Sequence, residues 1–221
     1  MHLTCSVVSK ITLRVPERAW MTSEPQVMGR VAAAHDLPIV AACLASAFYE
    51  DPLWGHWTFP HESRRRRDLL PFMTLMAQLG AAQGWTAMTA SGESVAIWTP
   101  PGASYGSPEQ EPLISEVLRR LFGARAPAIH ELFQQFEAHT PAGRFYHLEW
   151  WATHRRHAGR GFGGMLLREN LARVDAEHLP SYLESTNPGN LPRYEALGFR
   201  RIGEFAPPGG PTVTTMWREA R

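Results

Sequence analysis

The alternation of apolar and polar residues is clearest in the segment 147–167, which reads HLEWWATHRRHAGRGFGGMLL. In its first part, apolar and polar side chains alternate through Leu148, Glu149, Trp150, Trp151, Ala152 and Thr153. This period of two predicts a β-strand with two usable faces. A glycine cluster comes next, and the apolar residues after it predict a helix that begins near Phe162. We interpret the rest of the chain around this strand, turn and helix.

The same periodicities predict the other elements. Helices are expected over 37–48, 64–82, 108–122 and 126–139, with Asp36 as the cap of the first one. Strands are expected over 26–33, 84–98 (a pair joined by a turn at 90–92), 200–205 and 212–217. The pattern predicts a single α/β domain, residues 29–221, with a mixed sheet flanked by helices. Residues 1–28 form an extension whose role is not readable from the pattern.

The turn before the helix holds four glycines, Gly159, Gly161, Gly163 and Gly164. Without side chains, several backbone N–H groups can converge on an anion such as a phosphate at the start of the helix. Spaced as Gly-x-Gly-x-x-Gly, the turn matches a dinucleotide-binding fingerprint, with Glu184 about 20 residues further on, where such folds bind ribose. However, a polar run, 153–158, separates the strand from the first glycine, whereas a dinucleotide site has its glycine at the strand end.

The loop from Ala158 to Gly163 also resembles the acyl-coenzyme A signature of the GNAT acetyltransferase superfamily, Gln/Arg-x-x-Gly-x-Gly/Ala after a strand. The glycines match. Ala158 stands where the superfamily usually has glutamine or arginine, and the neighbouring Arg156, His157 or Arg160 could offset that difference.

A second motif makes the resemblance more specific. The segment 182–199 resembles the next strand and helix of the superfamily, with Asn190, Tyr194 and Gly198-Phe199 in register. Shorter matches at 47–52 and 95–100 resemble puromycin N-acetyltransferase and its relatives within the superfamily. The resemblance extends from about Val31 to the C-terminus.

The resemblance implies a mixed, mainly antiparallel central sheet flanked by helices. It also implies transfer of an acetyl group from acetyl-coenzyme A to a primary amine, here of a small molecule. The implied coenzyme A-binding residues are Trp151, Ala152, Thr153, Ala158, Gly159, Arg160, Gly161, Phe162, Gly163, Gly164 and Asn190. Backbone groups of the first three would pair with the pantetheine arm and polarise the thioester carbonyl. Asn190 would either bind the cofactor arm or act as a helix cap.

Two residues are the candidates for proton transfer. Tyr194 matches the family's tyrosine four residues after the motif asparagine, and a phenol can return a proton to a thiolate. The alternative role for Tyr194 is a core tyrosine. Glu149, a carboxylate in an apolar strand, is the candidate general base, with a salt bridge to an arginine as the alternative. His147 and His154 are further candidates for the base.

The aromatic segment 50–60 offers two readings. In the related acetyltransferases this region borders the acceptor pocket, so Trp54, Trp57 and Phe59 either line a pocket or close the core.

Composition sets the remaining bounds. The 221 residues carry a net charge of +1, which does not suggest a nucleic-acid binder, and 44% hydrophobic content can bury a sizeable core. Cys5 and Cys43 have neither metal-ligand nor disulfide-scaffold spacing, so we assign no metal ligands. The N-terminus lacks the apolar core of a signal peptide, and the longest apolar stretch, 39–48, is too short to span a membrane. We therefore expect a cytoplasmic protein, as a monomer or homodimer.

Two other functions are compatible with the glycine turn. A non-catalytic coenzyme A-binding regulator would bind the cofactor without transferring its acetyl group. A dinucleotide-dependent oxidoreductase would use Glu184 to bind ribose.

Overall fold

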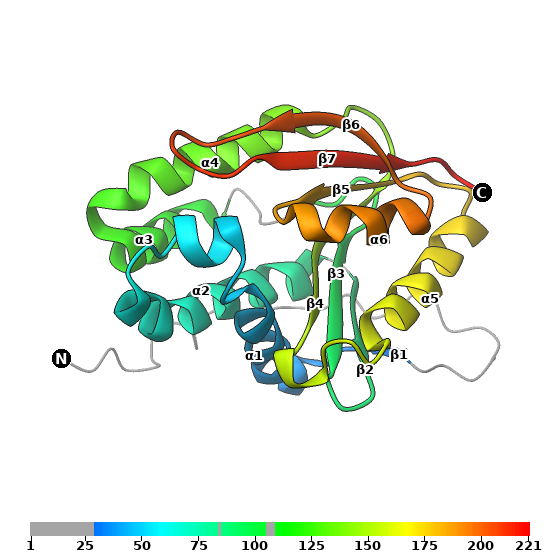
Figure 1. The fold of residues 1–221 in the computed structure, drawn as a ribbon, viewed down its shortest axis with the longest axis horizontal. Coiled ribbons are helices and arrows are strands. Elements are labelled where there is room, and N and C mark those ends of the chain that lie inside the picture. Colours follow the sequence, from blue (N-terminus) through cyan, green and yellow to red (C-terminus); the bar gives the residue numbers. More distant parts are fainter. Residues whose placement is uncertain (1–28, 84, 105–108) are drawn as a thin grey trace.

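A seven-stranded sheet in the order β1-β2-β3-β4-β5-β7-β6 runs through the computed structural model, which describes residues 29–83, 85–104 and 109–221 (Figure 1). The strands are β1 (Gly29–Val31), β2 (Trp85–Thr89), β3 (Ser94–Thr99), β4 (Tyr146–Thr153), β5 (Ser181–Ser185), β6 (Arg200–Phe205) and β7 (Val213–Arg218). Every neighbouring pair is antiparallel except β4 and β5, which are parallel. The predicted mixed, mainly antiparallel sheet is confirmed.

Helices cover both faces of this sheet. They are α1 (Leu37–Phe48), α2 (Glu62–Gln83), α3 (Glu111–Phe122), α4 (Ala126–His139), α5 (Phe162–Ala176) and α6 (Leu191–Ala196), with a π-helical turn η3 (Pro52–Trp57) after α1. α1 contacts β4 and α2 contacts β3, whereas α5 contacts β2, β3 and β4 on the other side (Figure 1). The helices predicted at 37–48 and 126–139 match α1 and α4. The predicted extension, residues 1–28, and the start of the first strand lie outside the described residues.

Two hydrophobic clusters correspond to the two faces. The first joins α1, η3, α2, α3 and α4 to the sheet, and the second joins α5 and α6 to it. Between the second cluster's elements, the buried Trp98 of β3 donates its Nε1–H to Oδ1 of the buried Asn170 of α5, at 3.0 Å. A buried polar pair of this kind fixes the rotation of α5 on the sheet as well as its distance.

A β-bulge interrupts β4. The pairing register with β3 shifts so that Ile97 lies opposite Trp150 while Trp98 lies opposite Leu148, which leaves Glu149 as the extra residue. The predicted strand is confirmed, and buried residues alternate with less buried ones along all of β4. Because of the bulge, however, the buried side chains do not all lie on one face of the sheet. Leu148 packs in the cluster with α5, but Trp150, two residues later, packs in the cluster with α1 and α4. The bulge changes which face each side chain of β4 occupies.

The start of α1 also differs from its prediction. Asp36 occupies the N-cap position, but its side chain makes no capping hydrogen bond to the helix. Its carboxylate instead accepts hydrogen bonds from Arg30 Nη2 at 2.7 Å and from the backbone N–H of Ala33 at 2.8 Å. The bond from the Arg30 guanidinium holds the pKa of Asp36 well below its usual range. Asp36 thus ties β1 to the beginning of α1.

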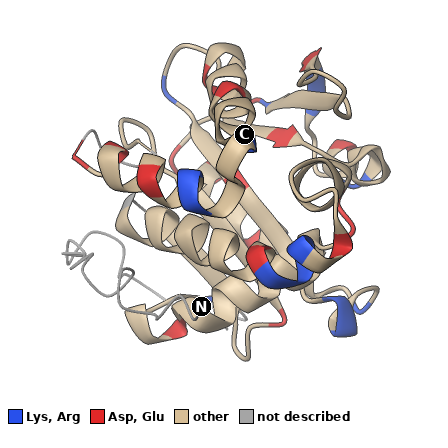
Figure 2. Ribbon diagram, turned by 90° about the vertical axis from the view of Figure 1, so that its left-hand side faces the viewer, with Lys and Arg blue, Asp and Glu red and all other residues tan. Residues whose placement is uncertain are grey.

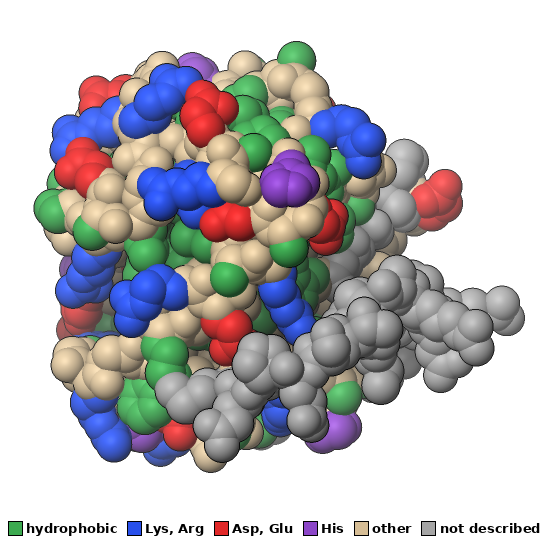
Figure 3. Space-filling view, turned by 90° about the vertical axis from the view of Figure 1, so that its right-hand side faces the viewer, with side chains coloured by type: hydrophobic (Ala, Val, Ile, Leu, Met, Phe, Trp, Pro, Cys, Tyr) green, Lys and Arg blue, Asp and Glu red, His purple; other side chains and the backbone are tan. Residues whose placement is uncertain are grey.

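Charged side chains of both signs are mixed over the surface. Figure 2 shows acidic and basic residues along the helices of one side, and Figure 3 shows the same mixture on the opposite side. Many form local ion pairs, such as Arg66 with Glu62, Arg119 with Glu116 and Arg201 with Glu195. Exposed pairs of this kind contribute little to stability. Across the described ranges, no helix is both long and apolar enough to cross a membrane.

The Trp98–Asn170 bond gives a stability prediction. Asn170→Leu leaves the indole N–H of Trp98 buried without an acceptor, so we expect the free energy of unfolding to fall by about 2 kcal/mol. Adding Trp98→Phe removes the orphaned donor, so the double variant should lose less stability than the sum of the two single variants. Denaturant unfolding of all four proteins measures this, and additive losses would contradict the coupling.

Candidate active site

The parallel strands β4 and β5 part after three residues. Their ladder pairs 146–148 with 181–183, after which the described part of β4 pairs with β3 alone and the end of β5 pairs with β7. A cavity of about 910 Å³ lies at this parting, and its lining includes residues of β4, of the end of β5 and the residue after it, and of α3, α4 and α6. Segments that are far apart in the sequence therefore meet at the opening between β4 and β5.

Aromatic side chains form one wall of the cavity. Trp54 of η3 stacks on Phe136 of α4, with ring centroids 5.6 Å apart, and packs against Trp150 of β4 at 5.0 Å. All three line the cavity, together with Phe48 and Phe133. Trp54 therefore both lines the cavity and belongs to the core.

The other two aromatic residues of this segment do not line the cavity. Phe59 is buried in the core, and Trp57 is half-buried and donates its Nε1–H to the carbonyl of Pro208 at 3.3 Å. Both interpretations of segment 50–60 therefore apply, because Trp54 lines the cavity whereas Phe59 closes the core.

The titratable side chains that line the cavity are mostly acidic. Four glutamates contribute to its lining, Glu111, Glu137, Glu149 and Glu184. Among the described residues, no lysine or arginine lines it. The cavity therefore presents negative charge, which favours a positively charged guest.

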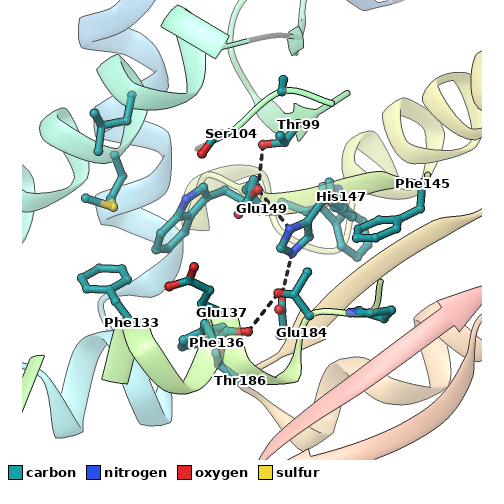
Figure 4. A pocket seen from close by; sticks show the side chains of 18 of the residues that line it. Thr99, Ser104, Phe133, Phe136, Glu137, Phe145, His147, Glu149, Glu184 and Thr186 are labelled. Atoms are coloured by element: carbon teal, nitrogen blue, oxygen red, sulfur yellow. Dashed lines mark hydrogen bonds and ion pairs between the residues drawn. The ribbon is translucent and has the colours of Figure 1, made fainter. Parts of the chain in front are cut away.

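His147 lies between two of these glutamates (Figure 4). Its Nε2–H donates to Glu184 Oε2 at 2.6 Å, and its Nδ1–H donates to Glu149 Oε1 at 3.1 Å. Burial disfavours a charged imidazole, but the two carboxylates outweigh it and raise the pKa of His147 well above its usual value. The ring is therefore an imidazolium that donates from both nitrogens, and it is not available as a base.

One of the two predicted roles of Glu149 was a salt bridge to an arginine, and no described arginine pairs with it. It accepts a hydrogen bond from the Thr99 hydroxyl at 2.7 Å in addition to its bond with His147. The third candidate base, His154, lies outside the cavity lining, where its Nδ1 accepts the backbone N–H of Arg156 at 3.3 Å. Glu149 therefore remains the candidate base, because it lines the cavity and its carboxylate can accept a proton.

Tyr194 faces the same cavity from α6. Its ring packs between Trp151, at 5.4 Å, and Phe199, at 6.0 Å, and the residue is only 7% exposed. Burial, with the nearby charge of Asp51, raises the pKa of the Tyr194 phenol, so it stays protonated at neutral pH. Tyr194 is therefore both a core tyrosine and a cavity residue, and its role as general acid stays a prediction.

The buried Asp51 fixes the segment between β5 and α6. It accepts hydrogen bonds from the backbone N–H groups of Leu53 and Trp54 at the start of η3 and from the Thr186 hydroxyl at 2.8 Å. Because Thr186 follows β5 directly, its hydrogen bond to Asp51 ties the start of η3 to the end of β5 beside the cavity. Asn190, at the N-cap of α6, also lines the cavity, and its Oδ1 accepts a hydrogen bond from Arg193 rather than capping the helix.

The open edge of β4 presents backbone groups. The carbonyl of Ala152 accepts a hydrogen bond from Ser94 Oγ of β3 at 2.6 Å, so this residue's backbone faces β3. Because successive residues of a strand alternate direction, the N–H and C=O groups of Trp151 and Thr153 face the opening. Of the three residues predicted to hold the pantetheine arm, these two have suitably directed backbone groups, and Trp151 lines the cavity.

The glycine turn follows at the far end of β4. Gly159 and Gly161 have φ of 76° and 87°, a region that favours glycine, and Gly161 is the N-cap of α5, which begins at Phe162 as predicted. Arg160 stacks on the Phe162 ring at 5.2 Å. The cavity lining includes none of the predicted residues of this turn, which are Ala158, Gly159, Arg160, Gly161, Phe162, Gly163 and Gly164.

Trp151 and Glu184 line the cavity, but the indole Nε1 of Trp151 and Oε1 of Glu184 are themselves buried. The Glu184 carboxylate also lies beside the Tyr182 hydroxyl, and burial together with the charge and hydrogen bond of Glu184 raises the pKa of Tyr182. The sequence pattern predicts Glu184 only as a possible ribose ligand and does not predict its hydrogen bond with His147. Its position inside the cavity, on a sheet with one parallel pair, differs from the parallel sheet of dinucleotide-binding folds.

The approach of α5 to β4 gives a second stability prediction. A Cβ added at Gly163 would lie 2.6 Å from Thr153 Oγ1 and 3.1 Å from the Trp151 ring, whereas one added at Gly164 meets nothing closer than 3.5 Å. Gly163→Ala should therefore lower the free energy of unfolding by about 1–3 kcal/mol. Its helical neighbour Gly164→Ala is the matched control and should be neutral or slightly stabilising. Equal effects in denaturant unfolding would refute the close contact.

Comparison with solved structures identifies the fold. No protein-family model matches the chain. It is similar to a histone acetyltransferase HPA2 and related acetyltransferase from Corynebacterium glutamicum, with a TM-score of 0.63 and 24% identity over 88% of this chain and 96% of that one. It is also similar to an agmatine N-acetyltransferase variant (TM-score 0.54, 18% identity, 86% and 98% covered). A polyamine N-acetyltransferase from Drosophila melanogaster is comparable (TM-score 0.53, 17% identity, 86% and 98% covered). The chain therefore has the GNAT acetyltransferase fold.

Proposed function

We propose that this protein transfers an acetyl group from acetyl-coenzyme A to a primary amine of a small molecule. The observation that carries the proposal is the parting of β4 and β5, which brings an unpaired strand edge and Tyr194 to one acidic cavity. The unpaired edge of β4 can hydrogen-bond the amide groups of the thioester arm. The phenol of Tyr194 can give a proton to the leaving thiolate, and the carboxylates can attract an amine.

Acetyl-coenzyme A would lie along β4. The outward backbone groups of Trp151 and Thr153 suit the amide groups of the pantetheine arm, and Asn190 lines the same cavity as Trp151. The pyrophosphate would lie at the glycine turn, where the first N–H groups of α5 are not used within the helix. The exposed Arg155, Arg156 and Arg160 surround this turn. Their positive charge compensates for Ala158, which offers no polar side chain.

The chemistry uses Glu149 and Tyr194. The acceptor, arriving as an ammonium, loses one proton to Glu149, and the neutral nitrogen then attacks the thioester carbonyl carbon. Backbone N–H groups on the open edge of β4 stabilise the resulting oxyanion, a contribution of about 3 kcal/mol per donor. The C–S bond breaks, the thiolate takes the Tyr194 proton, and the nitrogen's second proton restores the phenol. The products are the amide, coenzyme A and one proton.

Small amines fit this cavity better than a protein chain. Its volume of about 910 Å³ and aromatic walls suit a molecule of modest size, and its carboxylates suit a cationic group. Two solved enzymes of the same fold are named for agmatine and for polyamines, which are small amines. We also propose that the protein works in the cytoplasm, as a monomer or homodimer, without nucleic acid.

A non-catalytic coenzyme A-binding regulator is the second candidate. Ala158 favours it, because the loop lacks the polar side chain usual at this position. The two candidates differ in whether any amine causes release of a free thiol.

The proposed function is tested first by calorimetric titration of the purified protein with acetyl-coenzyme A, beside NADH. We expect micromolar binding of acetyl-coenzyme A alone, because the unpaired edge of β4 and the glycine turn match its arm and pyrophosphate. Thiol release is then screened against primary amines, beginning with aminonucleosides. Binding without thiol release would favour the regulator, and absence of binding would contradict both candidates.

The role of Tyr194 is tested by Tyr194→Phe, which keeps the packing between Trp151 and Phe199 but removes the proton donor. We expect turnover to fall by tens of times or more, about 2 kcal/mol of the barrier or above, because the thiolate then leaves unprotonated. Coenzyme A affinity, measured by the same titration, should stay within a factor of about three of wild type. Unchanged turnover would remove Tyr194 from the mechanism.

A further inference from the structure

Two glutamates would face each other if the ladder between β4 and β5 continued beyond its end. The ladder ends with Leu148 opposite Leu183. The next pair in the same register would be Glu149 opposite Glu184, and like charges in that position on neighbouring strands repel each other. The strands part at this point, and the ring of His147 lies between the two carboxylates (Figure 4). The arrangement of both glutamates therefore depends on this one side chain.

His147 binds both carboxylates through its two ring nitrogens. Nε2–H donates to Glu184 at 2.6 Å, and Nδ1–H donates to Glu149 Oε1 at 3.1 Å. The Thr99 hydroxyl donates to the same oxygen of Glu149, at 2.7 Å, so Oε2 receives neither of these bonds. The Glu149 side chain is 14% exposed, against 5% for Glu184. Glu149 is thus held by one oxygen, and its other oxygen is the one left to take up a proton.

The charge of this three-residue cluster suits a proton acceptor. One imidazolium and two carboxylates give a total of one negative charge, and a proton on Glu149 makes the total zero. Without His147, the two carboxylates would repel each other and hold a proton too tightly to release it. The Tyr182 hydroxyl beside Glu184 stays neutral, because burial raises its pKa. The other titratable residues that line the cavity are Glu111 of α3, His130 and Glu137 of α4, and Tyr194 of α6.

We propose that His147 is the positioning residue of the general base, holding the Glu149 carboxylate at the cavity while Glu184 holds the other side of the imidazole ring. This inference rests on the proposed function, because it assigns His147 a role relative to the base of that reaction. His147 does not take the acceptor's proton itself, since both of its ring nitrogens already carry one.

A purely structural role is the alternative for His147. In that case its two hydrogen bonds only tie β4 to β5 where their ladder ends, and they have no effect on the base. The two roles differ in one measurable property, the pH at which Glu149 takes up a proton. A positioning residue that carries a charge changes this pH, whereas a tie between strands changes only the stability of the fold.

The test is an NMR titration of the full-length protein, with glutamate labelled with carbon-13 at its side-chain carboxyl. The Glu149 signal is assigned by its loss in Glu149→Gln. His147→Gln removes a positive charge, so the midpoint of proton uptake by Glu149 should rise by about one pH unit or more. Glu184→Gln removes a negative charge and should lower the midpoint by a similar amount. The double variant restores the total charge of the cluster, so its midpoint should return close to that of wild type.

Glu137→Gln is the matched control, because it removes one exposed carboxylate of the same cavity lining that lies on α4, outside the cluster (Figure 4). It should move the Glu149 midpoint by no more than about 0.3 pH unit, since solvent and salt screen an exposed charge. Circular dichroism reports whether each variant is folded, and if one single variant does not fold, the other decides. Midpoints that stay at the wild-type value in the folded single variants overturn the proposal.

A kinetic measurement links the midpoint to the reaction. With an amine that gives thiol release, the acid limb of kcat/KM should move in the same direction as the Glu149 midpoint in each variant. The acceptor's own titration is the same in all of these proteins, so it cannot cause the difference. An acid limb that stays fixed while the midpoint moves overturns the role of His147 in the reaction. The NMR titration needs no acceptor, so its failure is separate from absence of thiol release, which would overturn the proposed function.

Discussion

The parting of β4 and β5 is the constraint on which the rest of the site depends. Parallel neighbours need a crossover connection, and here it runs through the glycine turn and α5. Each strand keeps an antiparallel partner on its other side, β3 for β4 and β7 for β5, so neither has to follow its parallel neighbour. The opening is therefore a property of the sheet itself, and its unpaired backbone groups are held by regular structure rather than by a loop.

The bulge in β4 then determines what the opening contains. Without the extra residue, Trp150 would share a face with Leu148 and leave the aromatic wall that it forms with Trp54. With it, His147, Glu149 and Trp150 all line the cavity. A single irregularity in one strand thus sets the ionised cluster beside the aromatic surface, which illustrates how bulges re-aim side chains at functional sites.

The sequence predicted those features that depend on local pattern. Helical and strand periods located the elements, and the spacing of glycines located the turn before α5 and its first residue, Phe162. The features that it missed depend on pairing between distant segments. His147 and Glu184 are 37 residues apart and meet only because β4 and β5 pair in one particular register. The bulge in β4 likewise depends on its pairing with β3. Asp36 does not cap α1 because its carboxylate binds Arg30, which lies on another element. None of these partners can be chosen from a one-dimensional pattern.

The ionised cluster is difficult to explain by stability. Transferring three charged groups from water into a protein wall costs several kcal/mol for each ion, and the attraction between them returns that cost only when every polar atom is satisfied. Here two carboxylates share one imidazolium, so one negative charge of the three groups has no counterion among them. Apolar residues of similar size would fill the same space at lower cost. The arrangement is therefore better explained by what enters the cavity than by the fold that surrounds it. A cationic guest would convert the cluster from an unbalanced one to a neutral one at the point where β4 presents its open edge.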